Sequence, residues 1–361
     1  MSEVPSTVSD LEAKPSTATS FCGINLNNCV YNASGALCTT AEELVTLYES
    51  EAGAVLTKSC TMESRVGNPE PRYFSSTTNE TFYSFSINSM GIPNNGVDFY
   101  MRLAKELYEE EISFSPEKAK PFIISLSGLT VAENMQLLKK MELAVGISAI
   151  ELNVSCPNIV GKPQLGYDFD GLRSFLNLVQ QNYCKAVPLG LKLPPYFDFA
   201  QFEAVAEIIR DFPVVEFIVC SNSLGNGLWV DTDTETVVIK PKNGFGGVGG
   251  SAMKATTLAN VHKFYELLGE PSLDKYPTIV LANGEIYKRN PVAIIGCGGV
   301  ITGKDVFDLV LCGASAVQIG TQFMLEGVTV FDSCSIELGE LMAKKGYTCL
   351  SDFRGKLKYI K

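Results

Sequence analysis

Eight short apolar runs, separated by segments with a helical pattern, constrain the fold of this chain more than any other feature. Most of the runs are continuously apolar, which is typical of strands buried on both faces of a parallel sheet. The runs occupy residues 29–35, 53–59, 121–128, 149–155, 188–195, 216–223, 292–299 and 316–321. Strands that alternate with helices predict βαβ units. The chain is therefore expected to be an α/β protein, a (β/α)₈ TIM barrel, with a doubly wound sheet as the alternative.

We expect a single barrel domain over residues 21–361. Residues 1–20 are rich in Ser, Thr, Pro and Glu, which predicts a disordered tail. Three longer segments interrupt the repeat: residues 60–100, residues 224–250 with a hairpin over 228–240, and a polar insertion over 267–290. Long loops in compact domains usually serve function or are disordered. We assign function to the first two, with the loops and the hairpin expected to lie over the carboxyl ends of the strands, and we expect the third to lie on the surface.

The composition excludes several classes of function. The chain has 29 Lys and Arg against 40 Asp and Glu, a net charge of −11, which disfavours nucleic acid and anionic membranes as partners. Its 11 cysteines include no CxxC pair, which argues against a zinc site and a disulfide scaffold and favours a reducing cytoplasm. No apolar run approaches the ~18 residues of a membrane span. Since His262 is the only histidine, a catalytic base must be another residue type.

Polar groups gather where the predicted strands end. They are residues 33–35, Lys58, Ser59, residues 127–128, Asn153 with Cys156, Lys192, residues 222–223, residues 298–299 and residues 320–321. The carboxyl ends of barrel strands form the catalytic face. The most informative group is the segment 151–158, ELNVSCPN, which brings a thiol between two amides, Asn153 and Asn158. A thiol can move a proton, and amides can hold a planar polar substrate because each both donates and accepts.

The last two predicted strands end in Gly298-Gly299 and Gly320-Thr321, the places where many barrels bind phosphate. A phosphate site together with the strand-end lysines Lys58 and Lys192 suggests flavin mononucleotide (FMN), because a lysine stabilises the negative charge of a reduced flavin. The G-x-G-x-x-G pattern over 244–249 lies too deep in the chain for a dinucleotide fingerprint. We expect it to be a flexible loop over a ligand.

A set of motifs resembles the class 1A dihydroorotate dehydrogenases, which are soluble FMN barrel enzymes of pyrimidine biosynthesis. The resemblance runs from about residue 21 to the C-terminus. The class 2 enzymes use a serine base and an N-terminal membrane helix, neither of which is expected here. The motifs are TKS (57–59), GNPEPR (67–72), INSMGIPN (87–94), ELNVSCPN (151–158), GKPQLGYDF (161–169), LKLPPYFD (191–198), NSLGNG (222–227), VIKPKNGFGG (238–247), GCGG (296–299) and QIGT (318–321).

The resemblance implies a role for each matching residue, with Cys156 as the active-site base and Lys58 beside it. It assigns the substrate to Lys58, Asn88, Ser89, Met90, Gly91, Ile92, Asn153, Asn158, Asn222 and Ser223. It assigns FMN to Ala33, Ser34, Lys58, Ser59, Asn153, Lys192, Ser221, Gly250, Gly298, Gly299, Gly320 and Thr321. No metal is implied. Ser221 stands where the family usually has an apolar residue.

The resemblance implies that dihydroorotate loses a hydride to FMN and a proton to Cys156, and that fumarate takes the electrons and leaves as succinate. It also implies a homodimer in the cytoplasm. An unperturbed thiol, with a pKa of ~8.5, can serve as a base in mildly alkaline solution. Two alternatives remain: an NAD-linked dihydroorotate dehydrogenase with an iron–sulfur partner, and a non-redox barrel enzyme that binds a phosphate.

Overall fold

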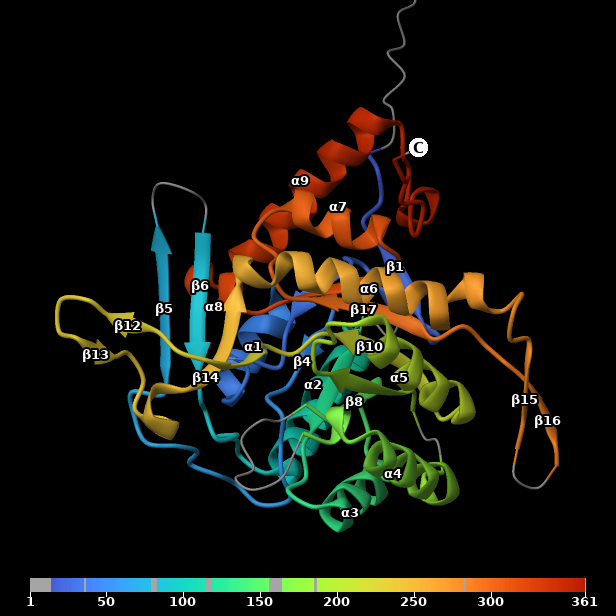
Figure 1. Cartoon of the computed structure of the whole chain (residues 1–361), viewed down its shortest axis with the longest axis horizontal. Helices are drawn as coiled ribbons and strands as arrows, with labels where there is room; N and C mark the ends of the chain where they lie inside the picture. The colour runs from blue at the N-terminus through green and yellow to red at the C-terminus, as the bar shows by residue number, and fades with distance from the viewer. Residues whose placement is uncertain are drawn as a thin grey trace, which may run out of the picture.

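A parallel eight-stranded barrel forms the centre of the molecule (Figure 1). The computed structural model describes residues 14–35, 37–78, 83–114, 119–155, 164–184, 187–281 and 284–360. The strand order is β3-β18-β17-β10-β9-β8-β7-β4. The strands are β3 (Val30–Asn32), β4 (Val55–Leu56), β7 (Phe122–Leu126), β8 (Ala149–Asn153), β9 (Leu189–Leu193), β10 (Val215–Cys220), β17 (Ala293–Cys297) and β18 (Ala316–Ile319). All eight predicted strands and the predicted barrel are confirmed.

A side-chain amide joins the two ends of this sheet, β3 and β4. Asn32 Nδ2 donates to the carbonyl of Leu56 (2.6 Å), and Asn32 Oδ1 accepts from the amide of Leu56 (2.8 Å). Gly53 N also donates to the carbonyl of Val30 (2.8 Å). An asparagine amide offers the same donor and acceptor as a peptide group. It therefore continues the hydrogen bonding where the short strand β4 cannot.

Helices alternate with the strands and cover the outside of the barrel (Figure 1). The first begins with a capping box between Thr40 and Glu43, in which the side chain of each accepts from the backbone amide of the other. The α-helices are α1 (Ala41–Glu49), α2 (Val97–Phe114), α3 (Val131–Met141), α4 (Phe169–Asn182), α5 (Phe199–Asp211), α6 (Lys254–Leu268), α7 (Gly303–Leu311), α8 (Thr321–Glu326) and α9 (Thr329–Lys345). The short 3-10 helices are η2 (Leu165–Tyr167), η3 (Pro241–Gly244), η4 (Ser251–Met253), η5 (Glu270–Ser272) and η6 (Leu350–Asp352).

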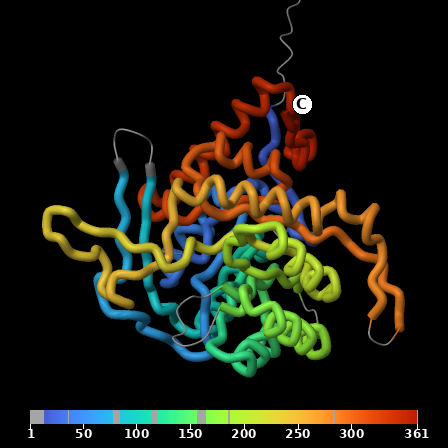
Figure 2. The backbone as a smooth tube through the Cα atoms, in the orientation of Figure 1, coloured from blue at the N-terminus to red at the C-terminus, as the bar shows by residue number. Residues whose placement is uncertain are grey.

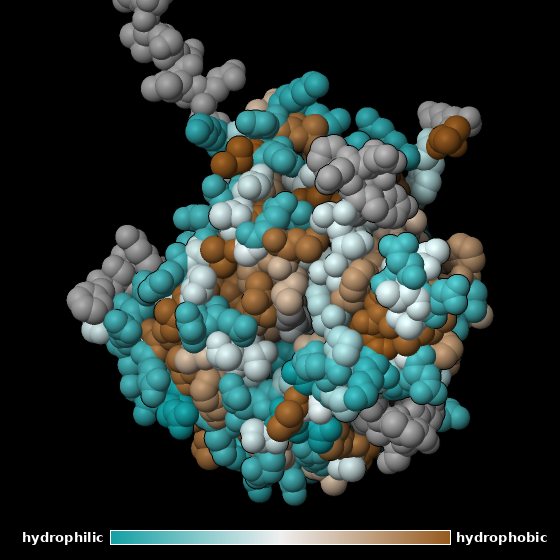
Figure 3. Space-filling model, turned by 90° about the vertical axis from the view of Figure 1, so that its left-hand side faces the viewer, coloured by the Kyte–Doolittle hydropathy of each residue, from teal (hydrophilic) through white to brown (hydrophobic). Residues whose placement is uncertain are grey.

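An antiparallel sheet, in the order β11-β14-β6-β5, stands at one side of the barrel. It is built from the two long segments that we assigned to function: β5 (Tyr73–Thr78) and β6 (Tyr83–Asn88) come from the first, and β11 (Leu224–Gly227) and β14 (Gly246–Gly250) from the second. The predicted hairpin is present as β12 (Val230–Asp231) and β13 (Thr236–Val237). The view of this side shows hydrophobic side chains gathered among hydrophilic ones (Figure 3).

The G-x-G-x-x-G segment is a strand, so the prediction of a flexible loop is wrong. Its last residues lie in β14, which pairs with β11 and β6. The glycines serve close packing: a Cβ on Gly247 would lie 2.2 Å from Ser223 Oγ, and one on Gly246 would lie 2.6 Å from the carbonyl of Asn88. The motif is a tightly packed strand and not a dinucleotide fingerprint.

The N-terminal segment and the insertion over 267–290 add structure to the eight βα units of the barrel. Ser16 N donates to the carbonyl of Thr348 (2.9 Å), and β1 (Thr19–Phe21) pairs with β2 (Ile24–Leu26), so the chain is ordered before the predicted boundary at residue 20. The insertion continues from α6 into η5 and then forms β15 (Thr278–Val280) and β16 (Ile286–Lys288). This hairpin extends from the body on the side opposite the antiparallel sheet (Figure 2). None of the described helices is both long and apolar enough for a membrane span.

Candidate active site

One cavity opens at the carboxyl ends of the barrel strands, between the barrel and the antiparallel sheet. It brings together most of the residues that the sequence predicts for the site. Those that line it are Ala33, Ser34, Lys58, Ser59, Asn88, Met90, Ile92, Asn153, Lys192, Ser221, Asn222, Ser223, Gly250, Gly298, Gly299, Gly320 and Thr321. Ser89 and Gly91 belong to the same loop but are not among the lining residues. Cys156 and Asn158 lie outside the described residues.

Hydroxyl and amide groups form a continuous hydrogen-bonded chain across the ends of four strands. Ser34 Oγ and Ser59 Oγ are 2.9 Å apart, and Asn153 Nδ2 donates to Ser59 Oγ (3.2 Å). Ser155 Oγ donates to Asn153 Oδ1 (3.0 Å), and Asn222 Nδ2 donates to Ser155 Oγ (2.8 Å). Because each member restrains its neighbour, the amides are held in fixed orientations before a ligand binds.

Lys58 is buried beside this chain, with 7% of its surface exposed. Its Nζ donates to the carbonyl of Gly35 (2.6 Å). Opposite the strand ends, Asn88 at the end of β6 donates from Nδ2 to the carbonyl of Gly247 (3.2 Å). A cation and an amide therefore face the cavity from the barrel and from the antiparallel sheet, an arrangement suited to an anionic ligand with carbonyl groups.

The loop 89–92 is supported by a residue of the GNPEPR motif. Asn68 Nδ2 donates to the carbonyl of Ser89 (2.8 Å), and Asn68 N donates to the carbonyl of Met90 (2.8 Å). A Cβ on Gly91 would lie 2.5 Å from Asn68 Oδ1, and Gly91 has a φ of +73°. The two motifs are thus halves of one structure, in which Asn68 shapes the loop that lines the cavity.

A second lysine, Lys192, lies at the floor of the cavity with 6% of its surface exposed. Its Nζ donates to Gln318 Oε1 (2.6 Å) and lies 3.1 Å from Cys297 Sγ. Gln318 Nε2 donates in turn to Glu151 Oε2 (2.6 Å) and to Tyr31 OH (3.2 Å). Burial alone would lower the pKa of Lys192, but its interactions with Cys297 and Glu151 outweigh burial and raise the pKa. Lys192 is therefore a protonated cation inside the barrel.

Glycines form a cradle beside Lys192. Gly298 and Gly299 follow β17 with φ angles of +120° and +79°, a region that favours glycine. A Cβ on Gly299 would lie 2.5 Å from Lys254 Cα. Backbone N–H groups in such a turn can point together at an anion. Gly320 and Thr321 line the same cavity, so the predicted phosphate residues are brought together.

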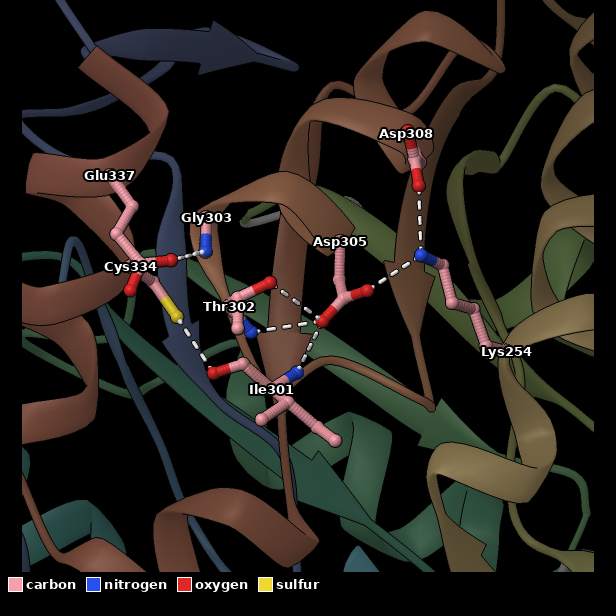
Figure 4. A network of polar contacts seen from close by, with 8 residues as sticks. All are labelled: Lys254, Ile301, Thr302, Gly303, Asp305, Asp308, Cys334 and Glu337. Atoms are coloured by element: carbon pink, nitrogen blue, oxygen red, sulfur yellow. Dashed lines mark hydrogen bonds and ion pairs between the residues drawn. The ribbon is translucent and has the colours of Figure 1, made fainter. Parts of the chain in front are cut away.

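A network of charged hydrogen bonds joins Lys254 to the residues that follow the cradle, from Ile301 to Asp308 (Figure 4). Lys254 Nζ contacts Asp305 Oδ1 (2.6 Å) and Asp308 Oδ2 (2.8 Å). Asp305 Oδ2 accepts from the amides of Ile301 and Thr302, each at 2.9 Å. Burial alone would raise the pKa of Asp305, but the hydrogen bonds from Lys254 and the two amides outweigh it and lower the pKa. The network ties the start of α6 to the turn that follows Gly299.

A buried hydroxyl in the cavity, Ser221 Oγ after β10, has no hydrogen-bond partner among the described residues. Buried hydroxyls normally find a partner. This atom therefore favours a bound ligand with a hydrogen-bonding group.

Several residues of the site were not predicted from the sequence. Glu151 and Gln318 are polar residues inside otherwise apolar strands, a signal that could have been used. Ser155, in the hydrogen-bonded chain, was missed because it lies beside the more conspicuous Cys156. The remaining lining residues that were not predicted are Tyr73, Ser86, Gly249, Met253, Cys297, Val300 and Met324. His262 is away from the cavity, on α6, where Nε2 lies 2.8 Å from Tyr359 OH.

Similarity to known proteins shows the family of this chain. A family model for dihydroorotate dehydrogenase matches residues 16–272 and 278–342. The chain is 46% identical over 345 residues to a dihydroorotate dehydrogenase (fumarate) of Lachancea kluyveri, covering 96% of this chain and 99% of that protein. It is 44% identical over 339 residues to one of Trypanosoma brucei brucei, covering 93% and 96%. The dihydroorotate dehydrogenase structure of Eimeria tenella with ferulenol is similar in fold, with a TM-score of 0.74 at 20% identity and coverage of 96% and 90%.

Proposed function

The chain belongs to the dihydroorotate dehydrogenase family, and from this membership we infer that it oxidises (S)-dihydroorotate to orotate in pyrimidine biosynthesis, with fumarate as electron acceptor. The reaction removes a proton from C5 and a hydride from C6 of the substrate. The observation that carries this inference is a single cavity that combines the buried cation Lys192, the cradle at Gly298-Gly299 and the amide chain.

The family is flavin-dependent, and we propose FMN as the cofactor of this chain. The residues fit it: the glycine cradle suits a phosphate, and the unpartnered hydroxyl of Ser221 suits a polar group of the cofactor's side chain or ring edge. When bound, FMN supplies the hydride acceptor, and fumarate takes the two electrons and leaves as succinate. Lys192 places a positive charge where reduction adds a negative one. The residues that would hold FMN are Ala33, Ser34, Lys58, Ser59, Asn153, Lys192, Ser221, Gly250, Gly298, Gly299, Gly320 and Thr321.

The substrate would lie between the barrel and the loop 89–92. Lys58 pairs with its carboxylate or a carbonyl oxygen, and the amides match its acid-amide edge. We propose Cys156 as the base that takes the C5 proton, since a thiolate is the strongest base that its segment offers. The residues proposed to bind substrate are Lys58, Asn88, Ser89, Met90, Gly91, Ile92, Asn153, Asn158, Asn222 and Ser223.

We further propose a homodimer in the cytoplasm. Leu228, Trp229, Val230 and Phe245 are exposed on the connections of the antiparallel sheet, and Trp229 packs on Phe85 with ring centroids 4.3 Å apart. An exposed apolar group of this kind is typical of an interaction surface. Sedimentation of the wild type against Trp229→Glu tests this assignment: a dimer that the charge does not weaken would place the interface elsewhere.

An anaerobic titration tests the reaction. The purified protein should be yellow, and L-dihydroorotate should bleach the visible flavin band. Fumarate and NAD⁺ are then added in separate cuvettes. Recovery with fumarate is the expected result, and recovery only with NAD⁺ would move the chain to the partner-dependent class. A yellow protein that dihydroorotate does not bleach would overturn the function, and a colourless protein that binds no flavin would overturn the cofactor.

A further inference from the structure

A second cavity lies at the opposite end of the barrel from the active site. It is bounded by the amino-terminal ends of β10 and β17, by the β1–β2 hairpin and by the insertion after α6. Its volume is about 400 Å³, enough for a small organic molecule. The insertion contributes residues to this cavity, so the site is a feature of this chain's added segment and not of the bare barrel.

Two arginines meet in this cavity. Arg210 stands in the last turn of α5, and Arg289 follows β16 at the end of the insertion. Both line the cavity, and the charge of Arg210 helps, after burial, to lower the pKa of Arg289. Neither guanidinium forms an ion pair with a carboxylate of the described residues. The two guanidinium groups repel each other in this half-buried cavity, and an anion bound between them would offset that repulsion.

The contacts of the two guanidinium groups differ. Arg289 is 5% exposed and donates from Nη2 to the carbonyl of Leu268 (3.0 Å) and to Ser272 Oγ (3.3 Å), which anchors the insertion to the end of α6. Arg210 lies on the ring of Tyr276, 4.2 Å from its centroid. Its Nη1 is buried and has no hydrogen-bond partner among the described residues. A buried donor of this strength normally has an acceptor.

Other charged groups in the cavity are compatible with an anion. Arg354 is a third guanidinium in the lining, and its Nη2 contacts Glu270 Oε1 at 2.6 Å, so the charge of Glu270 is balanced. Glu216 is the other carboxylate of the lining. With three guanidinium groups against two carboxylates, the described lining is positive in a chain whose net charge is negative.

We propose that this cavity is a binding site for a small phosphate-bearing anion, held by Arg210 and Arg289. Guanidinium groups match phosphate geometry because each offers paired N–H donors. Ile279 and Tyr287 of the hairpin also line the cavity and offer an apolar surface to an organic body attached to the phosphate. The proposal does not depend on the reaction at the other end of the barrel.

The test is a titration of inorganic phosphate into FMN-loaded protein at constant ionic strength, followed by calorimetry and by phosphorus NMR. FMN keeps the glycine cradle filled, and the comparison with Arg210→Gln separates binding in the second cavity from binding at the anionic substrate's place beside Lys58. We expect saturable binding of one phosphate, weakened at least ~10-fold in Arg210→Gln, the loss expected for one charge-assisted contact. The phosphate affinity of Arg210→Lys should lie between those of the wild type and Arg210→Gln, because lysine keeps the positive charge but lacks the paired N–H donors of a guanidinium group. Arg173→Gln, an exposed arginine on the neighbouring α4, is the matched control.

Two results would overturn the proposal: no saturable phosphate binding by the wild type, or equal binding by the wild type and a folded Arg210→Gln. Far-ultraviolet circular dichroism and retained flavin establish that the variants are folded. Phenyl phosphate distinguishes the sources of the phosphate group. Tighter binding than inorganic phosphate supports an organic phosphate on Ile279 and Tyr287, and equal binding supports free phosphate at the same arginines.

Discussion

Replacing Lys192 by methionine tests the charge balance at the barrel floor. Methionine fills a similar volume but leaves Glu151 without the cation that it meets through Gln318. Removing one of two opposite buried charges is strongly destabilising, because the charge that remains is uncompensated. The least costly response is for the folded variant to keep a proton on Glu151.

The cost of holding this proton sets the loss of stability in Lys192→Met. A glutamate in an unfolded chain titrates near pKa ~4.3. Holding its proton costs about 1.4 kcal/mol for each pH unit above that value. The variant should therefore lose ~3.7 kcal/mol of its free energy of unfolding at pH 7 and ~1 kcal/mol at pH 5. The folded variant then binds one proton more than the unfolded chain, and its stability falls as the pH rises. Glu151→Gln/Lys192→Met removes the titrating group and should lose this dependence.

The assay is urea unfolding of flavin-free wild type, Lys192→Met and the double variant between pH 5 and 8, followed by circular dichroism. Lys105→Met, at an exposed site on α2, controls for the loss of a lysine as such and should change little. Equal pH dependence in the single and double variants would refute the reasoning, as would a loss below ~1 kcal/mol at pH 7 in Lys192→Met. Lys192→Met should also retain FMN less well than the wild type.

Three further changes test the rest of the site. Cys156→Ser should keep bound flavin and lose most turnover near pH 7, since serine is a far weaker base. Cys184→Ser, at an exposed cysteine, is the control. Full activity of Cys156→Ser would show that the thiol is not the base. Asn68→Ala should raise the KM for dihydroorotate roughly fivefold through the lost hydrogen bond to Ser89, without loss of flavin, and an unchanged KM would contradict the support of the loop. Asp305 has a lowered pKa, so its contribution to stability is present above its ordinary pKa of 3.8 and is lost as the pH falls through its folded value. Asp305→Asn should therefore be less stable than the wild type at pH 7, with a smaller difference in acid, as measured by thermal unfolding at each pH.

The parts of the site that could be predicted are those with a local signal. Strand ends are visible in the sequence because an apolar run stops there, so Lys58, Asn153, Lys192 and Gly298 could be placed at one face of a barrel from the sequence alone. Gly298-Gly299 and Gly320-Thr321, after the last two strands, could be placed at this face for the same reason. The roles given to Cys156 and Asn158 stay predictions, since both lie outside the described residues.

The parts that could not be predicted depend on contacts between distant segments. Gly246 and Gly247 are compatible with a loop by composition, and only the strands on both sides show why a side chain has no room there. Asn32 looks like an ordinary polar residue, yet it joins the first and last strands of the sheet. Arg210 and Arg289 are 79 positions apart and meet only because the insertion folds back beneath β10 and β17.

The sequence by itself determined the barrel, its eight strands and the face that carries the chemistry, because burial on both sides of a parallel strand leaves an unbroken apolar run and places polar groups at its end. Tertiary structure alone decided which polar groups touch. The route from Lys192 through Gln318 to Glu151 crosses three strands, and the support of the cradle by Lys254 and Asp305 joins two helices. Such contacts depend on distances between segments that no local pattern encodes, and they set the charges and orientations on which the proposed chemistry depends.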